Sequence, residues 1–247
     1  HEIEYNKNDD RLYLAFEERY KMPQVKPAEY GAITKYFYDS CTPSEFQSEY
    51  NFGNSFFSFT SGPAFIINVN PYSVTNSTSP QYLWLEAELA GVDRSVTPWV
   101  IVMMHCPWYS SNKAHYEEWQ TVEMKNNMEA MFHQYDVNIV FSGHVHAIER
   151  SYPTYMDLVD SERGTTYINI GDAGNAEGHS TSYYAPPVWS AYTNGTQYGH
   201  GELTLVNTTH MEWAWVRNLD GDEVHSDSVT ICNSALGVRA DCMGNIE

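Results

Sequence analysis

Two short apolar runs, each of which ends in a histidine motif, constrain the fold of this chain more than any other feature. Residues 99–104 lead into His105, and residues 137–141 lead into the Gly-His-Val-His motif at 143–146. Short β-branched runs of this kind predict buried strands. Between them, residues 117–135 have apolar side chains at helical spacing, which predicts a right-handed βαβ unit. Because ligands of open α/β sheets bind at the carboxyl ends of the strands, we expect the histidines to meet there.

The remaining pattern surrounds this unit with further strands. A turn at Gly62-Pro63 predicts a hairpin, and three alternating runs near the C-terminus predict an antiparallel meander that closes the domain. Methionines recur along one stripe of the 117–135 helix, which is more typical of a core than of a cofactor site. The expected strands are 55–59, 64–69, 165–170, 201–206, 211–216 and 224–231; the expected helices are 81–89 and, weakly, 9–20; residues 183–198 are expected to form a loop.

Charge and length exclude several classes of function. The 247 residues, 42% of them hydrophobic, suffice for one large domain or most of one. The net charge of -19 opposes binding to nucleic-acid backbones or anionic lipids. A phosphate substrate would therefore need a local positive centre, which a pair of metal ions could supply. No apolar run approaches the roughly 20 residues that span a bilayer.

Three glycosylation sequons begin at Asn76, Asn194 and Asn207. A single sequon arises easily by chance, whereas three in a chain this acidic and tyrosine-rich favour the secretory route. We therefore expect a secreted glycoprotein, located outside the cell or in a vacuolar or lysosomal compartment.

Four cysteines are compatible with an oxidising compartment. Cys232 and Cys242 are close enough in sequence to close a small C-terminal loop as a disulfide. The state of Cys41 and Cys106 is left open: each could be free, or they could form a disulfide with one another or with residues outside this chain. Cys106 adjoins a candidate ligand, but we favour packing or a disulfide for it over metal binding.

The histidines at the strand ends carry the candidate chemistry. An isolated His144-x-His146 pair would be read as two ordinary surface histidines. Here Gly143 and a buried strand precede the pair, and His105 ends a sister strand, so we favour a metal site. His115 lies in a Ser/Asn-rich loop, where it could donate a proton to a phosphate oxygen or a leaving group. Plain solvent exposure is the commoner fate of such a histidine.

Taken together, these motifs resemble those of the purple acid phosphatases, within the calcineurin-like metallophosphoesterases. Several long motifs occur in the family's order along most of the chain, which makes the resemblance specific. They are His1-Glu2, the passage 82–99 with its Tyr-Leu-Trp-Leu, Val-Asp-Arg and Thr-Pro-Trp segments, His105-Cys-Pro-Trp-Tyr109, residues 143–151, residues 171–178 and the closing strands from 207 to 218.

The resemblance implies an α/β fold, the metallophosphoesterase αββα sandwich, in which two β-sheets lie between layers of helix. It also implies a binuclear centre of Fe(III) with Zn, Mn or Fe(II). Position by position, His105 and His144 resemble ligands of the divalent ion, and His146 a ligand of the ferric ion. His1 and His115 resemble the residues that bind phosphate and assist the leaving group. Strong acidification of water by the ferric ion predicts an acid pH optimum.

The family motifs that supply two aspartates, a tyrosine and an asparagine to the metals are absent from this chain. We therefore expect residues 1–247 to form a single, N-terminally incomplete metallophosphoesterase catalytic domain, completed by upstream sequence or by a separate chain. Ala114 replaces a histidine that many plant members carry, which leaves the assistance to the leaving group open.

The leading hypothesis is a secreted acid phosphatase that hydrolyses phosphate monoesters. One alternative is a phosphodiesterase or nucleotide pyrophosphatase on the same metals. Another is a non-catalytic structural glycoprotein that retains the fold. The sequence leaves open the physiological ester, the divalent metal and the oligomeric state, a homo-oligomer included.

Overall fold

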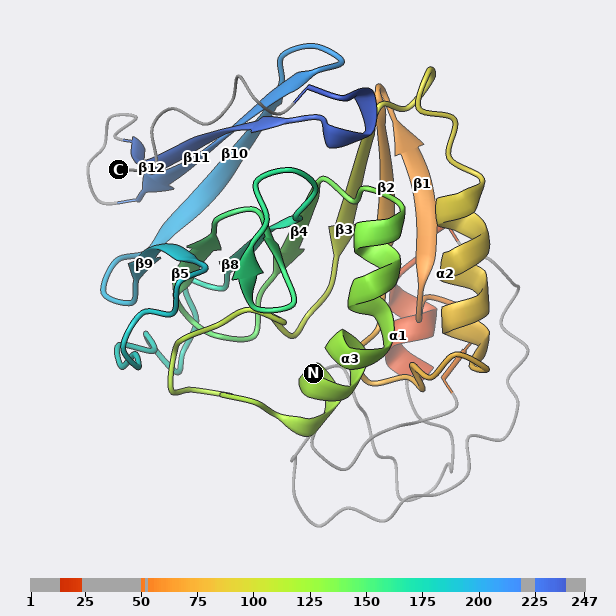
Figure 1. Ribbon diagram of the computed structural model, residues 1–247. Coiled ribbons are helices and arrows are strands. Elements are labelled where there is room, and N and C mark those ends of the chain that lie inside the picture. The colour runs from red at the N-terminus through yellow and green to blue at the C-terminus, as the bar shows by residue number, and fades with distance from the viewer. Residues whose placement is uncertain (1–13, 24–49, 52, 219–224, 239–247) are drawn as a thin grey trace.

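A seven-stranded mixed sheet organises the protein, for which a computed structural model describes residues 14–23, 50–51, 53–218 and 225–238 (Figure 1). The strand order is β1-β2-β3-β4-β8-β5-β9. The four strands from β2 to β8 run parallel, whereas β1, β5 and β9 each run antiparallel to a neighbour. The bounds are β1 Phe57–Ser61, β2 Ala64–Asn68, β3 Trp99–Met103, β4 Ile139–Ser142, β5 Ile148–Ser151, β8 Thr166–Ile170 and β9 Ser190–Asn194.

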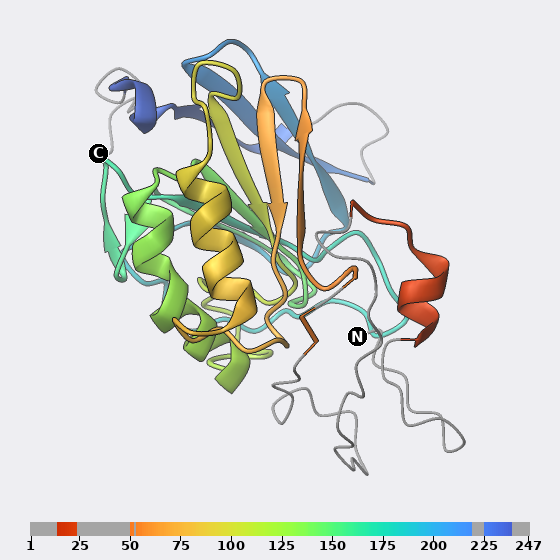
Figure 2. The ribbon, with the colours of Figure 1, turned by 90° about the vertical axis from the view of Figure 1, so that its right-hand side faces the viewer.

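Helices α2 (Pro80–Ala90) and α3 (Trp119–Gln134) cover one face of this sheet (Figures 1 and 2). Helix α3 connects β3 to β4, which pair in parallel, so the predicted βαβ unit is confirmed. Its Met124, Met128 and Met131 are buried among apolar side chains of the sheet, which confirms that the methionine stripe belongs to the core. Helix α2 begins where the Ser79 side chain accepts a hydrogen bond from the backbone N–H of Tyr82.

The opposite face packs against the predicted meander of β10 (Gly199–Leu205), β11 (His210–Arg217) and β12 (His225–Cys232). Trp213 and Trp215 of β11 are fully buried there, among isoleucines of the large sheet. The described residues thus supply a helical layer and both sheets of the predicted sandwich, and the fold class is confirmed. No helix in the described ranges has the length and apolar character needed to cross a membrane.

Two parts of the sheet differ from the prediction. Residues 183–198 were expected to be a loop but contain β9, and β5 directly follows the Gly-His-Val-His motif. Strand β5 was missed because its buried Glu149 and Arg150 break the apolar pattern. Strand β9, Ser-Ala-Tyr-Thr-Asn, has too few apolar residues to alternate.

A short hairpin of β6 (Thr154–Tyr155) and β7 (Leu158–Val159) was also not predicted. Helix α1 (Leu14–Arg19) and a 3-10 turn, η2 (Ser234–Leu236), complete the described elements.

Candidate metal centre

The two histidine motifs lie side by side at the carboxyl ends of β3 and β4. Backbone hydrogen bonds continue past the strand ends, from Met104 N–H to Phe141 C=O (3.0 Å) and from Gly143 N–H to His105 C=O (3.0 Å). His144 then adopts a φ of 62°, a left-handed conformation that is uncommon for a residue other than glycine. Such local strain is typical of functional sites and here sets the direction of the His144 ring.

The loop that carries His144 and His146 is supported by β8 and the turn after it. The Asn169 side-chain amide donates to the carbonyls of Val145 (2.9 Å) and Ala147 (2.7 Å). A Cβ atom on Gly171 would lie only 2.1 Å from the Val145 carbonyl oxygen, so this position requires glycine. The glycine-rich turn after β8 therefore holds the histidine loop in place.

His105 and His144 form a close imidazole pair. His105 Nε2 lies 3.0 Å from His144 Nδ1, and His144 is buried. Burial, followed by the neighbouring His144 ring, lowers the pKa of His105 to about 3, so the ring is neutral, as a metal ligand must be. Two nitrogens that share a tetrahedral zinc ion at about 2.0–2.1 Å stand about 3.3 Å apart. The pair therefore fits one shared cation.

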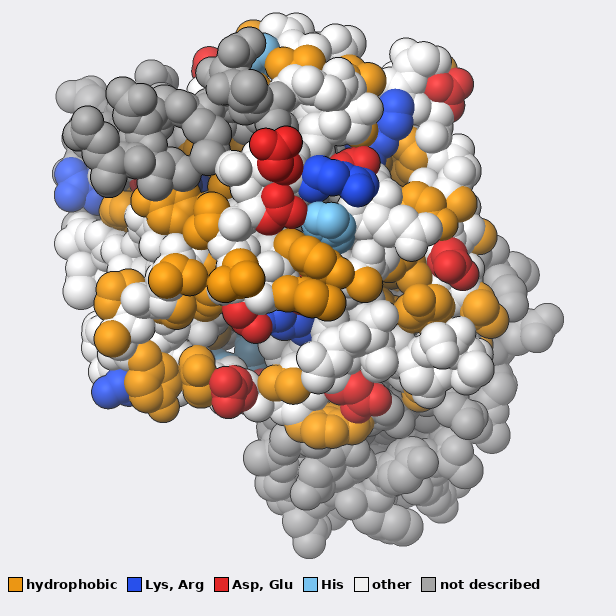
Figure 3. All heavy atoms as spheres, in the orientation of Figure 1, with side chains coloured by type: hydrophobic (Ala, Val, Ile, Leu, Met, Phe, Trp, Pro, Cys, Tyr) orange, Lys and Arg blue, Asp and Glu red, His pale blue; other side chains and the backbone are white. Residues whose placement is uncertain are grey.

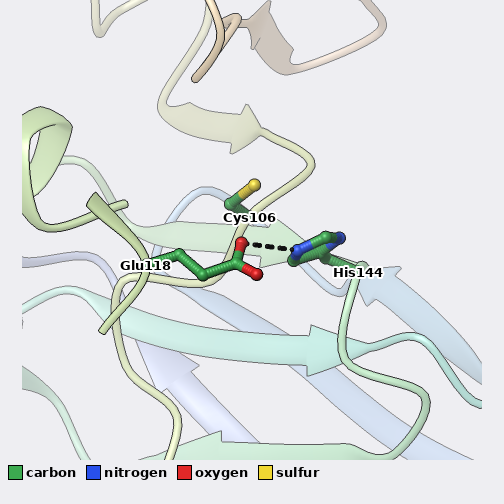
Figure 4. A group of neighbouring side chains, drawn as sticks. All are labelled: Cys106, Glu118 and His144. Carbon is green, nitrogen blue, oxygen red and sulfur yellow. Dashed lines mark hydrogen bonds and ion pairs between the residues drawn. The ribbon is translucent and has the colours of Figure 1, made fainter. Parts of the chain in front are cut away.

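Glu118 holds the far side of His144. Its Oε2 lies 2.9 Å from His144 Nε2, and its Oε1 lies 2.6 Å from His115 Nδ1 (Figure 4 shows the bond to His144). Gln120 Nε2 donates to the same carboxylate at 2.6 Å. Hydrogen bonds from His115 and His144 lower the pKa of Glu118, which stays ionised. A carboxylate on the outer nitrogen of a ligand histidine fixes its tautomer and orientation.

Glu118 is a site residue that was not predicted from the sequence. The available signal was its position three residues after His115, at the N-cap of the best-predicted helix. Such acidic N-caps are common without any role in a site. Only the folded chain shows that this carboxylate touches two histidines from separate loops.

His115 lies beside the pair and is partly exposed. Its ring centroid is 3.9 Å from that of His144, and its own φ is 57°. The hydrogen bond to Glu118 raises the pKa of His115 above its ordinary value. A protonated imidazole next to a ligand histidine can donate a proton to a bound oxygen.

Cys106 is a buried free thiol, as one of the open alternatives for it had allowed. Its Sγ lies 3.4 Å from the Tyr72 hydroxyl. The sulfur also lies near Glu118 and His144, and the donor atoms of the three residues lie within 4.8 Å of one another, so they could reach one ion (Figure 4). Burial raises the pKa of the thiol to about 11, so it is protonated and a weak ligand. Packing is therefore the better interpretation of Cys106.

The other predicted site residues are described only in part. His146 Nδ1 is 3.7 Å from the exposed Glu177 carboxylate, and none of its described contacts is to His105 or His144. His1 lies outside the described residues, so its role stays a prediction. Cys232 is buried, but Cys242 also lies outside the described residues. Of the three predicted glycosylation sites, Asn76 and Asn207 are exposed and Asn194 is half-buried at the end of β9.

Comparison with known proteins shows which family this chain resembles. A family model described as calcineurin-like phosphoesterase matches residues 1–147, and one described as iron/zinc purple acid phosphatase-like protein C matches residues 164–227. Over 184 residues the chain is 42% identical to probable purple acid phosphatase 20 of Arabidopsis thaliana. Over 188 residues it is 42% identical to Fe(3+)-Zn(2+) purple acid phosphatase 12 of the same plant.

These matches cover 74% and 72% of this chain but 43% and 39% of the two relatives, so the chain spans about two-fifths of their length. Among solved structures, purple acid phosphatase PPD1 from yellow lupin (Lupinus luteus) seeds matches with a TM-score of 0.63 and 21% identity. That match covers 78% of this chain and 35% of the lupin chain. At this identity the likeness shows the shared fold.

Proposed function

Because this chain belongs to the calcineurin-like phosphoesterase family and, within it, to the purple acid phosphatases, we propose that it hydrolyses phosphate monoesters at a binuclear metal centre. The observation that carries the proposal is the His105–His144 pair at the strand ends, with Glu118 behind it. The iron and zinc named for the Arabidopsis relative support Fe(III) with zinc here. Manganese and ferrous iron stay the alternatives for the divalent ion. His105 and His144 would hold the divalent ion, and His146 the ferric ion.

When bound, such ions would neutralise phosphate charge and lower the pKa of water at the site. The chain's own contribution is orientation and proton transfer. Glu118 fixes the rings of His144 and His115 through one carboxylate. Because His115 Nδ1 is held by Glu118, the proton at its Nε2 is the one that passes to the departing alcohol oxygen. His1 would bind the phosphate beside it.

We propose in addition that the protein is a secreted glycoprotein, outside the cell or in a vacuolar or lysosomal compartment. The three sequons support this, and Asn76 and Asn207 are exposed in turns. The formal charge of -19 supports a small phosphate ester as substrate over a nucleic-acid backbone.

Hydrolysis of p-nitrophenyl phosphate and of bis(p-nitrophenyl) phosphate by the purified, metal-loaded protein tests the proposal. We expect faster hydrolysis of the monoester, an optimum below pH 7 and both iron and a divalent metal by elemental analysis. A preference for the diester would instead favour a phosphodiesterase. Less than one equivalent of metal, together with no hydrolysis of either ester, would favour the structural glycoprotein and contradict the proposal.

A further inference from the structure

A pocket of 880 Å³ opens beside the candidate metal centre, and the proposed function makes no use of it. It lies between the loop that carries His115, the first turns of α3 and the β6–β7 hairpin, and His115 itself lines it. In Figure 3, hydrophobic side chains gather on the face formed by α3 and this hairpin, and the surface is hollowed among them. The volume is in the range that holds small organic molecules.

The mouth of the pocket is aromatic and unusually exposed. Trp119 is 46% exposed, Tyr184 is 49% exposed and Tyr116 is 43% exposed, although each is a large hydrophobic side chain. The rings of Tyr116 and Tyr184 pack against one another, with centroids 4.6 Å apart. Large apolar side chains that gather in solvent typically mark a binding site. Deeper in the pocket, Trp108 and Trp189 add further aromatic wall.

The charges in the pocket oppose an anionic occupant. Lys125 is the one lysine or arginine among the described lining residues, and it already pairs with Asp157 and lies 3.8 Å from the centroid of the Tyr109 ring. Glu129 is buried and accepts from the Tyr109 hydroxyl and from the Met156 N–H. Glu117 adds a further carboxylate. His115, at the edge towards the metal centre, already pairs with Glu118. Three carboxylates against this paired histidine and one paired lysine therefore disfavour a ligand that carries negative charge deep into the pocket.

We propose that this pocket binds the alcohol part of the phosphate ester and selects flat aromatic alcohols over small aliphatic and polyanionic ones. The position of the phosphate beside His115 rests on the proposed function, whereas the aromatic preference rests on the pocket itself. Rings in the mouth would pack against the faces of Trp119 and Tyr184 in offset-stacked or edge-to-face geometry. The reaction stays ordinary ester hydrolysis, in which water replaces the alcohol on phosphorus.

Trp119→Ala and Tyr184→Ala test the pocket, and Leu83→Ala, an exposed apolar residue on α2, is the matched control. For each protein kcat/KM is measured with 1-naphthyl phosphate and with glycerol 2-phosphate. Because naphthol is the better leaving group, each variant is compared with the native protein on the same ester. We expect the two pocket variants to lose roughly 2- to 10-fold on the naphthyl ester and clearly less on the glycerol ester. Leu83→Ala should change neither. An equal loss on both esters, or no loss, would overturn the proposal.

Binding of 2-naphthol, which has no phosphate, separates the pocket from the proposed activity. Titration calorimetry should show binding to the native protein and to Leu83→Ala, and weaker binding to Trp119→Ala. If naphthol binds in this way but no ester is hydrolysed, the pocket stands and the phosphatase function is wrong. If esters are hydrolysed but naphthol does not bind, the pocket proposal is wrong and the phosphatase function stands.

Discussion

Glu118 is the residue on which the geometry of the candidate centre most depends. One carboxylate contacts His144 at 2.9 Å and His115 at 2.6 Å, so it orients a ligand histidine and the proposed proton donor together. Groups that hold the outer nitrogen of a ligand histidine are worth about 10–100-fold in metal affinity. Glu118 therefore links metal binding to the placement of the proton donor.

We accordingly expect Glu118→Gln to weaken metal binding by about 10–100-fold, because an amide oxygen is a poorer acceptor than a carboxylate. Retention of metal against increasing chelator concentration measures this directly. Glu86→Gln, on the exposed side of α2, is the control and should bind metal like the native protein. Equal retention in the two variants would show that Glu118 does not support the metal site.

Asp160 gives a prediction on pH and stability. Burial alone would raise its pKa, but the N–H groups of Arg163 and Glu162 and the His133 ring lower it below the ordinary value. A carboxyl with a lower pKa in the folded state stabilises the protein above its unfolded pKa of about 3.9, and this contribution is lost as pH falls through the folded pKa. Urea unfolding should therefore find Asp160→Asn less stable than the native protein at pH 7, with the difference shrinking in acid. A difference independent of pH would contradict this.

For single residues, the sequence pattern indicates which side chains could bind a metal better than it indicates which side chains contact one another. His105 and His144 were expected to meet, because each ends a buried strand, and they do. His146 was expected at the same centre, but in the described structure its ring faces Glu177, so its role as a ligand stays a prediction. The part played by Glu118 depends on the close approach of two loops, and no local pattern encodes that approach.

At the scale of elements, Arg94 ties the βαβ unit together. Its guanidinium donates to the Tyr135 and Asp136 carbonyls just after α3, at 2.6 and 2.8 Å. It also donates to the Pro98 carbonyl before β3 and to Asn138 Oδ1 before β4, at 2.9 and 3.0 Å. One side chain therefore satisfies carbonyls at the end of the helix and fixes the starts of both strands that lead to the histidines.

Arg94→Ala should lower the free energy of unfolding by about 2–4 kcal/mol, because several partly buried acceptors lose a charged donor at once. Denaturant unfolding measures the change. Arg19→Ala, an exposed arginine on α1, should change it by less than about 0.5 kcal/mol. A similar small effect of both substitutions would contradict the role given to Arg94.

Elements with strong apolar periodicity were predictable from the sequence. Strands that polar contacts stabilise were missed. The unit of β3, α3 and β4 was predicted because its strands are apolar runs and its helix carries a methionine stripe. In β5, Glu149 is buried because Ser111 and Ser190 donate to it, and Arg150 because it pairs with Asp227. Those partners come from distant segments, so the sequence of β5 alone does not read as a strand.

In the whole molecule, the two sheets are joined by apolar packing and by a buried ion pair. Arg150 of β5 donates to both carboxylate oxygens of Asp227 in β12, at 2.7 and 2.8 Å. Both side chains are almost fully buried. Removing one partner of such a pair costs about 3–5 kcal/mol, because the other charge remains without compensation.

Asp227→Asn should therefore lower the unfolding free energy by about 3–5 kcal/mol, as measured by denaturant titration. Asp93→Asn is the control, since Asp93 bonds only within its own exposed turn. If Asp227→Asn cost no more than this control, the ion pair would not hold the sheets together.

The layered α/β architecture was predictable because motif order and apolar patterns both pointed to it, and the packing of Trp213 against the large sheet agrees. The aromatic pocket beside His115 was not predictable from the sequence, because its wall combines the start of α3 with the unpredicted β6–β7 hairpin. Such a pocket arises from tertiary packing of segments that are separated in sequence.

Anomalous diffraction from crystals of the metal-loaded protein would locate the ions relative to the two imidazoles. We expect a metal peak bound by His105 Nε2 and His144 Nδ1 at about 2.0–2.1 Å, with Glu118 on His144 Nε2. A metal-loaded protein whose two imidazoles stay hydrogen-bonded to one another, with the ions held elsewhere, would contradict it.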